Sequence, residues 1–218
     1  IIYNVSDQDR LKVGLFISDS YGNGVDEWPS KLAGLNSNFM LLGASNGGED
    51  HGDFVARMDD LLSLDTYTYN GTAKPEFCII QSSLNSPNNG DDLDTCLSEM
   101  ITLIEKSLAA ELVTIVTNMA VFGDSGSMSA AEGQIIAQYN YRLRSICISK
   151  GVGFVDMYKT IADPDNPGNI LPAYDFGDGT HVNAAGGLAI ATAINNVIKD
   201  IRSETTTAKS GFVSSWFS

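Results

Sequence analysis

The stretch Val13–Ile17 reads VGLFI, and it runs directly into Ser18–Gly24, which reads SDSYGNG. A short apolar run bounded by turn residues is typical of a strand that is buried on both faces of a sheet. The glycines and polar residues of the second run predict the loop in which that strand ends. Further short apolar runs predict four more strands, at residues 39–42, 77–80, 112–116 and 152–155.

Helical patterns separate these runs. Apolar side chains recur at helical spacing in five segments, residues 28–35, 54–62, 93–104, 135–147 and 190–201. Strands of four to six apolar residues that alternate with helices are what a parallel sheet covered on both faces requires. The pattern therefore predicts an α/β fold, a three-layer α/β/α sandwich with a central parallel sheet of about five strands.

Composition limits the possible functions. The 218 residues are 43% hydrophobic and carry a net charge of −14, so the chain is too apolar for a disordered acidic tail. The acid excess argues against nucleic acid and anionic lipid as partners, and no apolar run approaches the roughly 20 residues of a membrane span. We expect one domain over residues 1–203 and a Ser/Thr-rich tail, residues 204–218, that packs back or leads to another domain. The oligomeric state stays open.

The cysteines predict neither a disulfide framework nor a CxxC metal pair, and no metal or organic cofactor is implied. Cys78 and Cys147 lie in apolar stretches, where a buried thiol is expected. The start at Ile1, without Met or a signal-like segment, predicts a processed or trimmed chain. Lysine is scarce while Gly, Asn, Ser and Thr are plentiful, and this balance favours an extracellular protein, either secreted or part of a virion. The sequons at Asn4 and Asn70 match an N-glycosylation pattern, but such matches are frequent by chance.

Candidate catalytic residues come directly after the predicted strands. They are Ser18–Ser20 after the first strand, the small-residue loop 43–48 after the second, Ser83 and Asn85 after the third, and residues 178–183 before the last helix. The carboxyl ends of parallel strands meet at one edge of the sheet, which is where ligands bind in such folds. A serine, an Asp/His pair and amide donors at one edge are the parts that acyl transfer needs.

The chain has two histidines. His181 comes three residues after Asp178, and a turn can bring a carboxylate at that spacing to the imidazole. His51 has acidic neighbours in the sequence EDHGD but no apolar frame. We therefore expect His51 to be a solvated surface residue and His181 to be the base.

These residues occur in an order that resembles the SGNH hydrolases, also called the GDSL esterase/lipase family. The first family block is similar to Ser18–Gly24, and Trp28–Ala33 is similar to the segment that comes after this block in many members. The third block is similar to Ser83–Ser86, and the fifth block, Asp-x-x-His, matches Asp178–His181. The resemblance runs from about residue 11 to about residue 201, and the flavodoxin-like fold of the family agrees with the predicted sandwich.

The resemblance implies roles for individual residues. Ser20 would be the nucleophile, His181 the base and Asp178 the carboxylate that orients it. The backbone N–H groups of Ser20 and Gly48, with the side-chain amide of Asn85, would form the oxyanion hole. Two other glycines of the same segment, Gly43 and Gly47, compete with Gly48.

The sequence departs from the family pattern at four positions. Ser18 and Ser83 stand where the family has Gly, Ser86 stands where it has Asp, and Gly43 stands where it often has Asn. A serine in place of glycine is tolerated where φ stays negative. None of the four is a predicted triad or oxyanion residue, so the departures bear on the substrate more than on the mechanism.

Other interpretations compete with these. Gly123–Ser125 spells Gly-Asp-Ser more faithfully than residues 18–20 do, but it lies after the fourth strand, and we interpret it as part of a polar loop. Asp156 reads as a hydrogen-bonding residue at a strand end. Ser18–Ser20, Asp178 and Asn85 could themselves be turn and cap residues. Their order after successive strands favours a site.

The residues and the resemblance together predict a serine esterase that removes small acyl groups, such as O-acetyl, from a carbohydrate. The acidic surface favours a neutral glycan or a local basic patch as the binding partner. One alternative is a lysophospholipase, thioesterase or arylesterase on small hydrophobic esters. The other is a non-catalytic carbohydrate-binding or virion adhesion module on the same fold.

Overall fold

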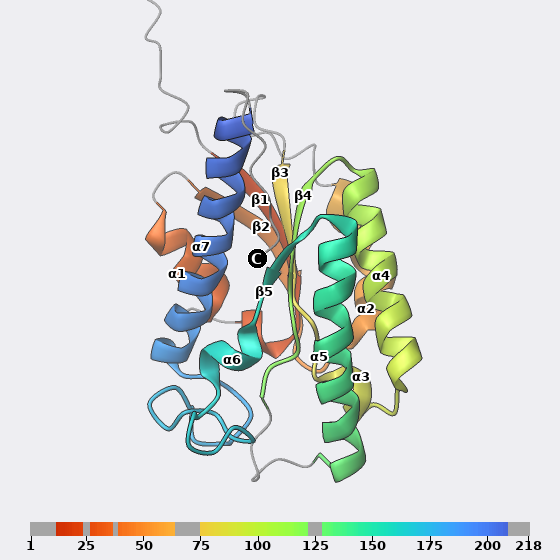
Figure 1. Ribbon diagram of the computed structural model, residues 1–218, viewed down its shortest axis with the longest axis vertical. Coiled ribbons are helices and arrows are strands. Elements are labelled where there is room, and N and C mark those ends of the chain that lie inside the picture. The colour runs from red at the N-terminus through yellow and green to blue at the C-terminus, as the bar shows by residue number, and fades with distance from the viewer. Residues whose placement is uncertain (1–11, 24–26, 37–38, 64–74, 122–127, 209–218) are drawn as a thin grey trace, which may run out of the picture.

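The computed structural model describes residues 12–23, 27–36, 39–63, 75–121 and 128–208. Its centre is a sheet of five parallel strands in the order β2-β1-β3-β4-β5 (Figure 1). The strands are β1 (Lys12–Ser18), β2 (Phe39–Ser45), β3 (Pro75–Ile80), β4 (Val113–Thr117) and β5 (Gly153–Val155). The predicted α/β fold with a parallel five-stranded sheet is confirmed.

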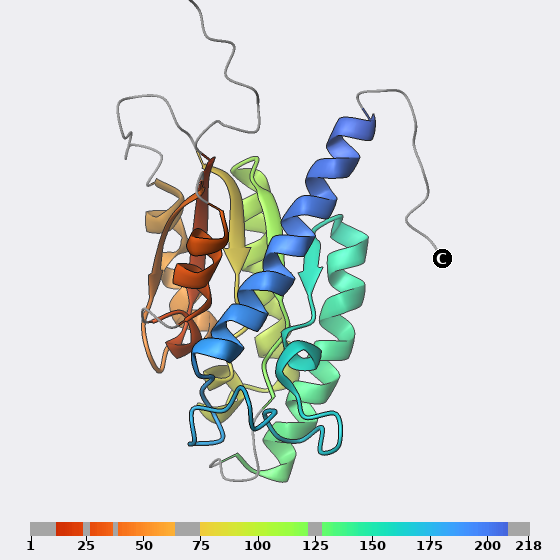
Figure 2. The ribbon, with the colours of Figure 1, turned by 90° about the vertical axis from the view of Figure 1, so that its left-hand side faces the viewer.

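Helices cover both faces of the sheet. Figure 1 shows one layer of α1 (Trp28–Leu35), α6 (Met157–Ile161) and α7 (Ala184–Ala208). The opposite layer contains α2 (His51–Leu62), α4 (Leu93–Ala109) and α5 (Ala130–Lys150), and α7 crosses its own face of the sheet diagonally in Figure 2. The short helices η1 (Ser20–Gly22) and α3 (Asn85–Asn88) come after β1 and β3.

The strand order creates a switch point beside β1. Strand β2 lies next to β1 on one side within the sheet, and the chain then returns to place β3 next to β1 on the other side. The loops after β1 and β3 therefore start as neighbours and lead to helices on opposite faces of the sheet, which is the position at which ligands bind in open α/β folds. The sheet centre is buried on both faces, and Leu15, Ile79 and Val116 are at most 1% exposed.

Strand β2 is longer than the sequence predicts, and this corrects one candidate for the site. It extends to Ser45, so Gly43 lies within the strand, opposite Phe16 of β1. A Cβ on Gly43 would lie 2.2 Å from the carbonyl oxygen of Phe16, so glycine is needed there for close packing. Gly43 is therefore not part of the loop that was expected to supply an oxyanion donor.

Helix α7 continues past the predicted domain boundary at residue 203 and ends at Ala208. The last residues of the predicted tail, 209–218, lie outside the described residues, as does the second Gly-Asp-Ser at Gly123–Ser125. Cys78, Cys96 and Cys147 are buried free thiols. None of the helices in the described part of the chain has the length and apolarity to cross a membrane.

The packing at Gly43 can be tested. We expect Gly43→Ala to lower the free energy of unfolding by about 1–3 kcal/mol, because the added methyl overlaps the backbone of β1. Gly34→Ala is the matched control, since nothing lies within 4 Å of its Cβ position in α1. That change should raise the free energy of unfolding by about 0.5–1 kcal/mol. Urea unfolding measures both, and a Gly43→Ala variant as stable as the wild type would contradict the packing.

Candidate active site

Ser20 lies at the start of η1, separated from β1 by Asp19 alone. The carboxyl oxygen Oδ1 of Asp19 caps this short helix by accepting a hydrogen bond from the N–H of Tyr21 at 3.0 Å. Asp19 is only 1% exposed, so its carboxyl holds the turn from inside the protein. We refer to Asp19–Gly22 as the serine turn.

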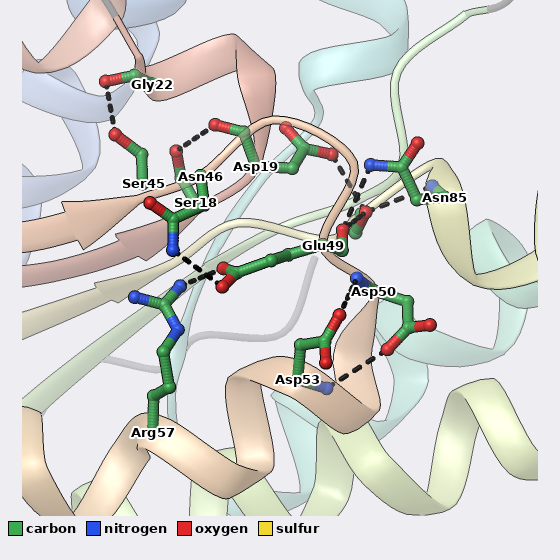
Figure 3. A network of polar contacts seen from close by, with 11 residues as sticks. Ser18, Asp19, Gly22, Ser45, Asn46, Glu49, Asp50, Asp53, Arg57 and Asn85 are labelled. Carbon is green, nitrogen blue, oxygen red and sulfur yellow. Dashed lines mark hydrogen bonds and ion pairs between the residues drawn. The ribbon is translucent and has the colours of Figure 1, made fainter.

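The serine turn packs against the ends of β1 and β2. A Cβ on Gly22 would lie 1.9 Å from Oγ of Ser18, so the turn requires glycine at this position. The hydroxyl of Ser45 donates to the carbonyl oxygen of Gly22 at 2.7 Å (Figure 3). Ser18, the first departure from the family pattern, therefore fills the space that Gly22 leaves.

Residues 174–183, which we term the histidine loop, lead into α7. Oδ1 of Asp175 accepts hydrogen bonds from the N–H groups of Gly177 at 2.8 Å and Gly179 at 3.2 Å. Asn183 donates from Nδ2 to the carbonyl of Asp175 at 3.0 Å, and its Oδ1 caps the start of α7. These bonds hold the loop in one conformation.

Hydrogen bonds through His181 join the serine turn to the histidine loop. Nε2 of His181 lies 3.0 Å from Oγ of Ser20, and Nδ1 lies 2.7 Å from Oδ2 of Asp178. Desolvation raises the pKa of Asp178, but hydrogen bonds from His181 and Thr180 outweigh it and lower this pKa to about 2. An ionised Asp178 selects the tautomer with the proton on Nδ1, so the lone pair of Nε2 faces Ser20.

Tyr21 ties the same two segments together from the interior. Its buried hydroxyl donates to the carbonyl oxygen of Thr180, and its ring centroid lies 6.0 Å from that of His181. Burial raises the pKa of Tyr21 well above its ordinary value, so the hydroxyl stays a donor. Sequence reasoning missed this residue, because an aromatic residue after a serine has no distinctive spacing.

The segment after β2, residues 46–50, is closed on itself, and we term it the glycine loop. Nδ2 of Asn46 donates to Oε1 of Glu49 at 2.7 Å, and Arg57 of α2 pairs with the other carboxylate oxygen of Glu49 (Figure 3). Asp50 then caps the start of α2. Four side chains thus fix the loop at both of its ends.

Two glycines form the tip of this loop. A Cβ on Gly47 would lie 3.8 Å from Cβ of Ser20, so the glycine loop lies against the serine turn. Gly48 has a φ of 84°, a conformation that favours glycine, and no atom lies within 4 Å of its Cβ position. The loop therefore presents an open backbone position next to the contact with Ser20.

Asn85 begins α3 at the carboxyl edge of β3. Its Nδ2 donates to the carbonyl oxygen of Glu49 at 3.0 Å, which joins this segment to the glycine loop (Figure 3). Ser83 lies beside it, with Oγ 2.7 Å from the same Glu49 oxygen and 2.9 Å from Oδ2 of Asp19. The segments that carry the five residues predicted for the site are thus joined by direct contacts.

His51 corrects the expectation of a solvated surface residue. Its side chain is 0% exposed and stacks on the ring of Tyr139, with centroids 5.5 Å apart. Nε2 of His51 accepts a hydrogen bond from the N–H of Ser83 at 2.9 Å, and burial lowers the pKa of His51 to about 4. The acidic neighbours gave no indication that His51 is buried, because the first turn of a helix can point one side chain inward while the residues next to it face solvent.

The remaining departures from the family pattern also have partners. Oγ of Ser86 accepts a hydrogen bond from the backbone N–H of His51 at 2.9 Å. Within the described ranges, Glu111 is the only non-glycine residue with a positive φ. Ser18 and Ser83 therefore stand in ordinary backbone conformations, where serine replaces glycine without strain.

Asp156 has the structural role that the sequence predicts. It caps α6 by accepting a hydrogen bond from the N–H of Lys159 at 3.0 Å, and Nδ2 of Asn118 donates to the same oxygen at 2.9 Å. In the part of the chain that the structure describes, no group of His, Cys, Asp and Glu side chains could hold a metal ion.

A sequence profile of the GDSL-like lipase/acylhydrolase family matches residues 9–187. The chain belongs to this family. The membership confirms the resemblance seen in the sequence and the expected enzyme class, a carboxylic ester hydrolase of the GDSL type. No curated protein matches the chain significantly by sequence.

Solved structures of a GDSL-like lipase and of two esterases share the fold. A GDSL-like lipase from Bacteroides thetaiotaomicron superposes with a TM-score of 0.70 at 17% identity, over 87% of this chain and 89% of its own. A psychrotrophic esterase from Pseudoalteromonas sp. gives 0.66 at 17% identity, over 88% and 99%. An acetyl xylan esterase gives 0.66 at 20% identity, over 85% and 99%.

The buried His51 predicts a pH dependence of stability. Its pKa is about 4 in the native state against 6.5 for the free side chain, so between these values the unfolded chain binds a proton that the native chain does not. The free energy of unfolding should therefore fall as the pH is lowered through this window, by at most about 1.4 kcal/mol per pH unit from this group.

His51→Gln isolates that contribution, because a glutamine amide oxygen can accept the Ser83 hydrogen bond without titrating. The variant should lose part of the pH dependence between about pH 6.5 and about pH 4, as measured by urea unfolding. Equal pH dependence in the two proteins would show that His51 is not a buried neutral histidine.

Proposed function

We propose that this GDSL-family enzyme is a serine esterase that hydrolyses small acyl esters, O-acetyl groups above all, on a neutral carbohydrate. The observation that carries the catalytic part is the continuous hydrogen-bonded line from Oγ of Ser20 through His181 to Asp178. A nucleophile, a base and an orienting carboxylate in this arrangement are the groups that acyl transfer uses.

The proposed mechanism starts with Ser20. Its Oγ attacks the ester carbonyl carbon while its proton passes to Nε2 of His181, and the ionised Asp178 stabilises the imidazolium. His181 then gives that proton to the departing alcohol, which leaves an acyl-serine. Water attacks the acyl carbon, again losing its proton to Nε2, and Ser20 regains its hydroxyl when the acid is released.

Donors around Ser20 would stabilise the oxyanion that forms in each half of the reaction. We assign this role to the backbone N–H groups of Ser20 and Gly48 and to the side-chain amide of Asn85. Nδ2 of Asn85 carries two protons, and its hydrogen bond to Glu49 uses one of them. The open side of Gly48 and its positive φ support its selection over Gly47. Loss of one such donor typically costs about 100- to 1000-fold in kcat.

The surroundings of the site support a small acyl group and a polar alcohol. The described loops around it, residues 85–92 and 163–169, are rich in Asn, Asp, Gly and Ser. Within residues 163–183, Phe176 is the only large hydrophobic side chain that is exposed, at 71%. One exposed ring offers much less apolar surface than a long acyl chain requires for binding. The structural similarity to an acetyl xylan esterase agrees with an acetylated glycan.

Hydrolysis of p-nitrophenyl acetate tests the catalytic assignment. We expect Ser20→Ala to lower kcat/KM by at least about 1000-fold, because the nucleophile is lost. Ser125→Ala, in the second Gly-Asp-Ser, is the matched control and should keep wild-type activity. Equal rates for Ser20→Ala and the wild type would remove Ser20 from the mechanism. No turnover by the wild type on any ester would favour a binding module instead.

A series of p-nitrophenyl esters from acetate to palmitate tests the acyl preference. The value of kcat/KM should be highest for acetate and fall as the chain grows, since the polar loops give a longer chain little apolar surface to bury. A preference for octanoate or longer esters would contradict the acetyl assignment and favour a lipase or thioesterase.

A further inference from the structure

The hydroxyl of Ser83 has more acceptor neighbours than it can serve. Its Oγ lies 2.7 Å from the carbonyl oxygen of Glu49 and 2.9 Å from Oδ2 of Asp19, and it accepts the N–H of Asn85 at 3.0 Å. A hydroxyl has one proton, and a carbonyl oxygen can only accept. If Asp19 were ionised, one of the two short oxygen–oxygen contacts would have no proton between its atoms.

The other oxygen of Asp19 is clearly an acceptor. The indole N–H of Trp28 donates to Oε1 of Gln81 at 2.9 Å, and because an indole can only donate, the Gln81 amide has one possible orientation. Nε2 of Gln81 therefore donates to Oδ1 of Asp19 at 2.7 Å, alongside the backbone N–H of Tyr21. A proton on the carboxyl group would accordingly be on Oδ2, the oxygen that faces Ser83.

We propose that Asp19 is a neutral carboxylic acid whose Oδ2–H donates to the Ser83 hydroxyl, which in turn donates to the Glu49 carbonyl oxygen. Each of the two short oxygen–oxygen contacts of Ser83 then has one proton between its atoms. The resulting chain of hydrogen bonds runs from the serine turn to the glycine loop. Asp19 is thus a positioning residue for the oxyanion donors, a role that rests on the proposed function. Ser83 supplies the hydroxyl that the family's usual glycine lacks.

The surroundings of Asp19 agree with a neutral acid. Its hydrogen-bond partners, Tyr21 N–H, Gln81 and Ser83, are all uncharged, and no ion pair to Asp19 is found among the described residues. The ionisable groups that face it are Tyr21 and His181. Burial raises the pKa of the Asp19 carboxyl, against the opposing effects of these hydrogen bonds and of His181.

A neutral Asp19 also suits the chemistry. Negative charge develops on the substrate next to Ser20, and a buried carboxylate adjacent in sequence would oppose it in a medium of low dielectric constant. Asp178, on the other side of His181, is ionised and stabilises the imidazolium. Two carboxyl groups held in opposite protonation states around one serine would divide these tasks.

Infrared difference spectroscopy at neutral pH tests the protonation state directly. We expect the spectrum of the wild type minus Asp19→Asn to show the C=O stretch of a carboxylic acid, shifted in D2O, and no carboxylate band. Asp156→Asn is the matched control, because Asp156 is a partly exposed strand-end aspartate that accepts hydrogen bonds from Asn118 and Lys159. It should show carboxylate bands only. Carboxylate bands for Asp19 would overturn the proposal.

A second variant covers the case in which Asp19→Asn fails to fold. Ser83→Gly removes the acceptor of the Asp19 proton, so the carboxylic-acid band should move to another frequency. If no carboxylic-acid band differs between the wild type and Ser83→Gly, the proposal is also overturned. These spectra need no turnover. They therefore decide the state of Asp19 even if Ser20→Ala shows that the proposed esterase mechanism is wrong.

Kinetics test the positioning role. The acid limb of the kcat/KM pH profile reports the proposed base, His181, and a charge on Asp19 would shift it. Asp19→Asn should leave this limb in place, whereas a limb moved to lower pH would show that Asp19 is ionised. Asp19→Ala, which keeps neither donor nor acceptor, should have a kcat at least about tenfold below that of Asp19→Asn. Equal kcat values would remove the positioning role.

Discussion

The arrangement of the candidate site depends on the contacts of one buried group, the carboxyl group of Asp19. It accepts hydrogen bonds from the serine turn and from Gln81, and it contacts Ser83 after β3. Through Ser83 and Asn85 the same network reaches the carbonyl of Glu49 in the glycine loop. Buried polar groups are costly unless all are satisfied, so a network of this kind holds its segments in one relative position.

This network can exist because of the strand order. With β1 placed between β2 and β3, the loops after these three strands leave the same edge of the sheet as neighbours. The histidine loop comes from much later in the chain and is joined to them by the hydroxyl of Tyr21 and by the ring of His181. The site thus consists of short segments from four parts of the sequence, each fixed by the rigid element next to it.

The sequence predicts the strands, the helices and the residues of the Asp-x-x-His block, since apolar periodicity and short-range spacing are local properties. It fails where an outcome depends on a neighbour distant in the chain. Gly43 reads as a loop residue because nothing local shows that β2 continues beside Phe16. His51 reads as a surface residue because its partners, Ser83 and Tyr139, are far away in sequence. For Tyr21 and Gln81, neither the residue type nor the spacing in the sequence indicates a role at the site.

By itself, the sequence determined the fold class, the family and the residue types available for chemistry, because alternating apolar runs and ordered motifs depend on nearest neighbours along the chain. Only the tertiary structure decided which oxygen each polar side chain contacts, which glycine faces open space and which carboxyl group loses contact with water. Protonation depends on these contacts, because burial and hydrogen bonding, not residue type, set the charge of a carboxyl group. Asp19 and Asp178 have the same side chain, and their different surroundings give them opposite pKa shifts.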